Sequence, residues 1–285
     1  PAAGAGGFET LTQTLCEQGW QAFQEIERQR SGDLGGIVAS LVDRHLQKTL
    51  AEQRTARAKA VATRREPITG TSEFPNIREE TATVLAIAPV KLDGKRVQGS
   101  LAERNQGEII RSFVDGAGRA DALAAPATGL RADPLPSLRL SEPFEALRDK
   151  ADAQPQRPVV FLATLGPIAD FTARAGFARN LFEAGGLAAP SGDGFAKDGA
   201  TDLDALIGAF RASGAKLACL CGSDAAYAAE GPAVTEALAK AGATVWLAGR
   251  PAESEALSKA GVATFIYMGC DVVETLTRAQ AIASA

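Results

Sequence analysis

Residues 216–249 read KLACLCGSDAAYAAEGPAVTEALAKAGATVWLAG, and this stretch decides the fold of the C-terminal half. One short apolar run ends at Gly222, a helical segment is expected at 233–241, and a second apolar run begins at Thr244. Two short apolar runs on either side of a helix are typical of a β/α/β unit in a parallel sheet. The stretch therefore predicts an α/β fold around it.

The same alternation extends from Pro158 to the C-terminus. Strands are expected at 159–165, 186–189, 216–221, 244–248 and 264–267, and helices at 171–184, 203–212, 233–241, 252–260 and 272–282. Right-handed crossovers place helices on both faces of such a sheet, so we expect an open, five-stranded parallel sheet of flavodoxin-like order. Ligands of these folds bind beyond the carboxyl ends of the strands. The rim of that crevice is expected at Gly166, Gly222, Ser223, Asp224, Gly249 and Gly269.

The N-terminal half has a different pattern, which is mainly helical. Apolar residues at helical spacing predict a helix at 8–29, and a further helical region is expected at 33–65, ending before Pro67. A short β-like segment follows at 68–74, and no fold is assigned to 79–136. The segment 141–150 reads as a helix capped by Ser141 with Pro143 in its first turn, and Asp271 with Glu274 resembles a capping box. The expected organisation is two parts, 1–150 and 151–285.

Composition excludes several classes of function. The 285 residues carry 30 Lys and Arg against 34 Asp and Glu, a net charge of -4, so no strong field would attract nucleic acid or anionic lipid. No apolar run approaches the roughly 20 residues that cross a membrane. The four cysteines form no CxxC pair and are expected to be reduced thiols, which favours a cytoplasmic setting. Because the chain opens at Pro1 with no initiator Met, we interpret it as a piece of a longer polypeptide.

Four stretches resemble methylmalonyl-CoA mutase. They are PAAGAGGFE at 1–9, WQAFQEIE at 20–27, PITGTSEFPN at 67–76 and LSEPFEALR at 140–148, and the last two resemble the small, beta-type subunit most closely. The resemblance implies that 1–150 is the end of a (β/α)8 barrel with a helical connecting region, and that 151–285 is a cobalamin-binding-type domain. It also implies a heterodimer with a large subunit, in which adenosylcobalamin drives the isomerisation of (R)-methylmalonyl-CoA to succinyl-CoA.

The resemblance also identifies where cobalamin would be held. Members that bind it carry DxHxxG after the first strand: the His ligates cobalt, the Asp orients that His, and the Gly admits the nucleotide tail. Here the loop at 166–173 reads GPIADFTA, so Ile168, Asp170 and Ala173 replace the Asp, His and Gly. A carboxylate is a poor substitute for imidazole, and Ile168 cannot accept the orienting hydrogen bond. We expect an accessory chain that binds no cobalamin itself, the cofactor being held by the large subunit.

The remaining candidate residues have structural interpretations. His45 is the only histidine and is expected on a helix surface or interface, and Cys219 with Cys221 is expected to fill the core. No catalytic or metal-binding residue is therefore expected. Two alternatives stay open: a domain that binds another small ligand or regulator in the vacated crevice, and a cobalamin domain with an unusual ligand.

Overall fold

The computed structural model describes residues 4–80, 85, 107, 110–111, 132–197 and 199–285. The chain divides into two units. Unit one comprises Pro1–Ala51 with Thr81–Pro136, and unit two comprises Glu52–Glu80 with Ser137–Ala285. The division of the chain between residues 150 and 151 stays a prediction. No helix within the described ranges is long and apolar enough to cross a membrane.

Unit one begins with one long helix, and short elements follow it along the chain. In order they are α1 (Gly6–Glu27), β1 (Arg30–Ser31), β2 (Leu34–Gly35), α2 (Gly36–Val42) and the start of α3 (His45–Ala62). The helix expected at 8–29 is confirmed as α1, which has no buried residue.

The expectation of helix throughout 33–65 is wrong at two points. The chain first makes an antiparallel ribbon of β1 and β2, which reverses at Gly32, where φ is +59°. The helical region is then interrupted between α2 and α3 at Arg44, where φ is +63°. Glycine adopts positive φ without steric cost, which is why this glycine-rich segment turns.

In unit two, the β-like segment expected at 68–74 is a turn with a single bridge between Thr69 and Glu73, so that prediction is wrong. The Gly70 amide donates to the Glu73 carbonyl (2.7 Å), and the Ile68 amide donates to the Ser72 hydroxyl (2.9 Å). Gly70 has a φ of +79°. The turn forms because Gly70 and Ser72 satisfy the backbone locally instead of leaving it free to pair with a strand.

This turn is fastened to the helices of unit two by buried polar contacts. Arg64, whose side chain is only 3% exposed, forms an ion pair with Glu73 (3.2 Å). The Asn180 amide donates to the same carboxylate (2.8 Å), and Arg148 donates to the Gly70 carbonyl (2.9 Å). Glu73 and Arg148 belong to the SEFPN and LSEPFEALR stretches, so these two stretches join each other through the turn.

The helix expected at 141–150 is α6 (Glu142–Asp152). Pro143 lies in its first turn as predicted, but Ser141 makes no side-chain cap. The dihedral angles of Ser141 are helical (φ -75°, ψ -21°), whereas a capping side chain needs extended backbone. Phe144 and Ala151 are fully buried in the core of unit two.

The sheet of unit two is parallel and has the order β3-β6-β7-β8. Its strands are β3 (Val160–Thr164), β6 (Leu217–Cys221), β7 (Thr244–Ala248) and β8 (Val262–Ile266). The fifth strand expected at 186–189 is reduced to one parallel bridge between Val159 and Ala188. Pro190 follows and has no N–H to continue the ladder, which explains the correction from five strands to four among the described residues. With this bridge counted, the order is the flavodoxin-like 2-1-3-4-5.

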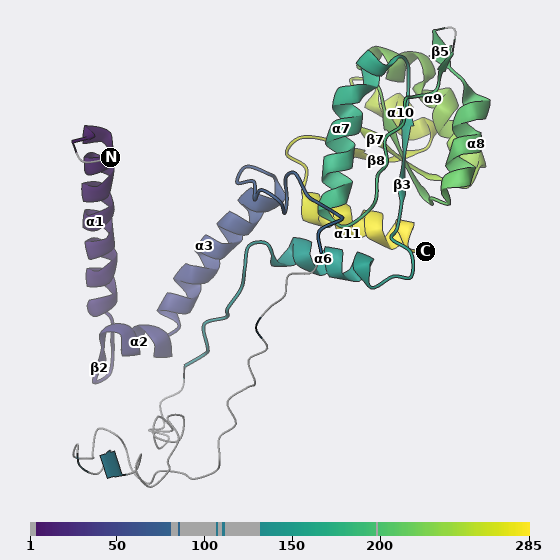
Figure 1. Ribbon diagram of the computed structural model, residues 1–285. Coiled ribbons are helices and arrows are strands. Elements are labelled where there is room, and N and C mark those ends of the chain that lie inside the picture. Colours follow the sequence, from purple (N-terminus) through teal and green to yellow (C-terminus); the bar gives the residue numbers. More distant parts are fainter. Residues whose placement is uncertain (1–3, 81–84, 86–106, 108–109, 112–131, 198) are drawn as a thin grey trace. The chain divides into compact units, whose positions relative to one another are not determined.

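Helices cover both faces of the sheet (Figure 1). One core cluster joins the sheet to α6, α7 (Ile168–Ala184) and α11 (Val272–Ala283), and the other joins it to α8 (Leu203–Ser213), α9 (Asp224–Lys240) and α10 (Ser254–Ala260). A small ribbon of β4 (Ala196–Lys197) and β5 (Ala200–Thr201) precedes α8. All five expected helices are present, but α9 begins well before residue 233, because Ser223 caps it and the helix runs through Pro232.

Candidate functional site

The loop after β3 leads directly into α7 at the carboxyl edge of the sheet. Gly166 is buried with a φ of +74°, and Pro167 is the extended residue before the helix. Ile168 is 58% exposed, and Asp170 and Ala173 are also exposed on α7. A Cβ added at Gly166 would lie 3.2 Å from the Asp170 carboxylate, so this carboxylate folds back over the loop backbone.

Arg174 crosses the crevice from α7 to the loops after β6 and β7. Its Nη2 donates to Asp224 Oδ1 (2.7 Å), and its Nη1 lies 2.8 Å from where a Cβ on Gly249 would stand. Gly249 has a φ of +128°, so only glycine fits both the backbone and the neighbouring guanidinium. Burial opposes the charge of Arg174, but its hydrogen bond to Asp224 and the nearby Tyr227 raise its pKa above the ordinary value. The cation therefore stays in the crevice.

Tyr227, in the first turn of α9, links the carboxyl ends of β6 and β7 by hydrogen bonds. Its hydroxyl accepts from the Gly222 amide (3.0 Å) and donates to the Ala248 carbonyl (2.6 Å). The Arg174 guanidinium lies over its ring, 5.0 Å from the centroid. Burial, reinforced by nearby Cys221, raises the pKa of Tyr227 well above its usual range, so the phenol remains a neutral hydrogen-bonding group.

Beneath Arg174 and Tyr227, side chains fill the space between α7 and the sheet. Phe171 is 4% exposed, and its ring lies 2.7 Å from where a Cβ on Gly194 would stand. Thr164, at the end of β3, is buried too, and its hydroxyl has no hydrogen-bond partner in the described structure. The crevice expected from the strand pattern exists in outline, but side chains of the chain itself occupy it.

The other rim residues have local roles. Ser223 caps α9 by accepting from the Ala226 amide (3.2 Å). Asp271 caps α11 by accepting from the Glu274 amide (2.9 Å), which is one of the two hydrogen bonds of the expected capping box. Gly269 is exposed, with a φ of +91° that permits the turn before α11.

The residues present do not fit cobalamin. The only histidine, His45, is the exposed first residue of α3, outside the α/β fold. Cys219 and Cys221 are fully buried in β6, and burial raises the pKa of the Cys219 thiol, so Cys219 is not poised as a thiolate ligand. Within the described ranges, no three His, Cys, Asp or Glu residues gather in a way that could hold a metal ion.

Sequence reasoning missed Arg174 and Tyr227. The signal was their spacing: Arg174 follows buried Phe171 by three residues, and Tyr227 follows the cap Ser223 by four. Each interval is about one helical turn, which returns a side chain to the same face of the helix.

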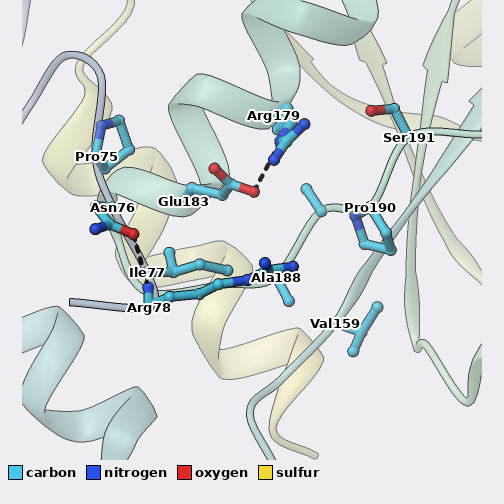
Figure 2. A pocket seen from close by; sticks show the side chains of 11 residues that line it. Pro75, Asn76, Ile77, Arg78, Val159, Arg179, Glu183, Ala188, Pro190 and Ser191 are labelled. Carbon is cyan, nitrogen blue, oxygen red and sulfur yellow. Dashed lines mark hydrogen bonds and ion pairs between the residues drawn. The ribbon is translucent and has the colours of Figure 1, made fainter. Parts of the chain in front are cut away.

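A separate pocket of about 650 Å³ lies near the amino end of β3. Figure 2 shows Ile77 and Arg78 on one side and the Arg179–Glu183 pair on the other. No site is expected here from the sequence, because the walls of the pocket come from three separated segments.

Four parallel strands with helices on both faces and a truncated fifth strand define a flavodoxin-like α/β domain. The chain that carries this domain belongs to the methylmalonyl-CoA mutase family. The family model described as methylmalonyl-CoA mutase matches residues 1–113.

Relatives match along nearly the whole chain. The methylmalonyl-CoA mutase small subunit of Streptomyces virginiae is 39% identical over 97% of this chain and 37% of its own length. The small subunit of Propionibacterium freudenreichii subsp. shermanii is 33% identical over 97% of this chain and 36% of its own. That of Porphyromonas gingivalis is 29% identical over 97% of this chain and 38% of its own. The chain thus spans less than two fifths of the length of these relatives.

Proposed function

We propose that the chain is part of the small subunit of a methylmalonyl-CoA mutase, where it acts as an accessory region and holds no cobalamin. Its similarity to small subunits over 97% of its residues supports this placement. The name small subunit implies a large-subunit partner, and we propose a cytoplasmic heterodimer of the two. In that assembly, residues 1–150 would extend the barrel and connecting region, and 151–285 would be the degenerate cobalamin-type domain.

The observation that supports the accessory role is that the carboxyl-edge crevice lacks an imidazole ligand and is occupied by Arg174. Cobalt ligation needs a neutral imidazole held by a hydrogen-bonded partner, and the corresponding positions are Asp170 and Ile168. Arg174, paired with Asp224 and stacked on Tyr227, spans the same crevice. A ligand entering here would have to displace a charged side chain from its partners.

The reaction is then assigned to the rest of the assembly. Adenosylcobalamin bound by the large subunit would supply the radical chemistry that converts (R)-methylmalonyl-CoA to succinyl-CoA. Two titratable residues of the crevice already have partners, since Asp224 is paired with Arg174 and the Tyr227 hydroxyl is bonded to backbone. Because Arg174 and its partners occupy this crevice, the structure also argues against the alternative that another ligand binds there.

A cobalamin titration tests the proposal. The full chain is titrated with hydroxocobalamin and with adenosylcobalamin at micromolar concentrations, followed in the visible, with the large subunit as positive control. We expect no saturable spectral change. Saturable binding with a His-on spectrum would refute the accessory role, and base-on binding would support the unusual-ligand alternative.

Matched variants separate the two causes of exclusion. The triple variant Ile168→Asp, Asp170→His, Ala173→Gly restores the ligand positions but leaves Arg174 across the crevice, so we expect it to stay without cobalamin. Adding Arg174→Ala to it should give the first measurable binding. Co-purification with the large subunit tests the partner separately, and loss of that complex would contradict the small-subunit assignment whatever the cobalamin result.

A further inference from the structure

The pocket near the amino end of β3 has the size and walls of a small-molecule site. Its volume of about 650 Å³ falls within the roughly 300–1,000 Å³ of ligand pockets in general. The pocket is distinct from the carboxyl-edge crevice, because Val159, which lines it, precedes β3 whereas the crevice follows this strand. A site here is therefore independent of whether cobalamin binds.

One wall of the pocket is held in place by buried contacts. The segment 75–78 leaves the turn that Arg64 and Glu73 anchor, and the Phe74 amide donates to Asn180 Oδ1 on α7 (3.2 Å). The Arg78 amide then donates to Asn76 Oδ1 (3.0 Å), which fixes the start of the Arg78 side chain.

A second wall is the truncated fifth strand. Ala188 donates to the Pro158 carbonyl (2.9 Å) and accepts from the Val160 amide (2.8 Å), and Pro190 then turns the chain away. The chain departs from β3 at this point, which leaves space at the sheet edge. Pre-formed walls lower the cost of binding because little ordering is needed.

The charged side chains that line the pocket are two arginines and one glutamate, so their net charge is positive. Arg179 and Glu183 form an i,i+4 ion pair (2.9 Å) and neutralise each other. The Arg78 guanidinium has no hydrogen-bond or ion-pair partner in the part of the chain that the structure describes (Figure 2). The acidic Glu79 and Glu80 follow Arg78 but do not line the pocket.

The Arg78 guanidinium and the apolar side chains that line the pocket define the class of ligand. A guanidinium fork matches carboxylate and phosphate oxygens with two parallel hydrogen bonds. Apolar side chains supply much of the remaining lining, chiefly Pro75, Ile77, Val159, Ala188 and Pro190. We propose that the pocket binds a small organic anion, with its carboxylate or phosphate on Arg78 and a short apolar body against these side chains.

Calorimetric titration of the full chain tests this site. The probes are butyrate, butyl phosphate, inorganic phosphate and the uncharged butan-1-ol. We expect saturable binding of butyrate, butyl phosphate or both, weaker binding of inorganic phosphate because it lacks the apolar body, and none of butan-1-ol. Which of the two charged butyl probes binds better distinguishes a carboxylate ligand from a phosphate ester.

Variants decide whether the binding is at this pocket. Arg78→Gln should weaken binding at least about tenfold, and Ser191→Trp, which places an indole at the lining, should abolish it. Arg211→Gln removes an exposed arginine of α8 away from the pocket and should leave binding unchanged. The proposal is overturned if no charged probe saturates, if butan-1-ol binds equally well, or if Arg78→Gln has no more effect than Arg211→Gln.

Discussion

Replacing Tyr227 by phenylalanine removes one oxygen atom from the carboxyl edge of the sheet and should lower the free energy of unfolding. The ring stays, so packing in the core and under Arg174 is preserved. The hydroxyl, however, is the partner of the Gly222 amide (3.0 Å) and of the Ala248 carbonyl (2.6 Å), and Tyr227 is fully buried. Gly222 and Ala248 are themselves buried, so we expect no water to replace the lost hydroxyl.

The magnitude follows from the groups left without partners. A buried donor or acceptor that loses its hydrogen bond costs about 1–3 kcal/mol. We therefore expect Tyr227→Phe to lower the free energy of unfolding by about 1–3 kcal/mol. For a domain of this size each kcal/mol lowers Tm by roughly 2–4 °C, so the expected fall is roughly 2–12 °C.

The assay is urea and thermal unfolding followed by the fluorescence of Trp246, which is fully buried in β7. The chain has only two tyrosines, so Tyr267→Phe is the matched control. Tyr267 is half-buried, and no hydrogen bond of its hydroxyl occurs in the described structure, so its loss should change stability by less than about 0.5 kcal/mol. The reasoning fails if Tyr227→Phe unfolds at the wild-type urea midpoint, or if both variants lose the same stability.

Further predictions concern pH, caps, the buried ion pair and the exposed helix. Burial raises the pKa of Tyr227, whereas a tyrosine in the unfolded chain ionises near pH 10. The contribution of Tyr227 to stability is therefore complete below about pH 10 and is lost as pH rises further. Tyr227→Phe should reduce this alkaline loss of stability in urea unfolding. Asp271→Ala should cost about 1 kcal/mol in thermal unfolding, through loss of the α11 cap, and an unchanged Tm would contradict the capping role. Glu73→Gln leaves Arg64 buried without its counter-charge and should cost about 1–3 kcal/mol, measured by the same unfolding assay. Apolar residues of α1 are exposed, so the isolated chain should self-associate in sedimentation velocity. Leu15→Glu should reduce this self-association. A monodisperse monomer of the unchanged chain would contradict the prediction.

Much of the α/β architecture was determined by the sequence alone. Apolar runs at 159–165, 216–221 and 244–248 are too short for helices and have strand composition, and they became three neighbouring parallel strands. The cap at Asp271 was also readable, because capping is a contact between residues three apart. The absence of histidine from residues 166–173 is a sequence fact as well, since the chain has one histidine and it lies at residue 45.

Only the tertiary structure decided what occupies the crevice and where a pocket forms. Arg174 and Asp224 are 50 residues apart and meet because parallel strands bring their carboxyl ends to one edge. The sequence predicts a strand at 186–189, but this segment pairs at one residue, because strand pairing depends on the partner backbone and on Pro190 beyond it. The pocket joins Arg78, Glu183 and Val159 from three segments. Local periodicity carries information only about neighbours within a few residues, so contacts of this kind become visible only when the chain is folded.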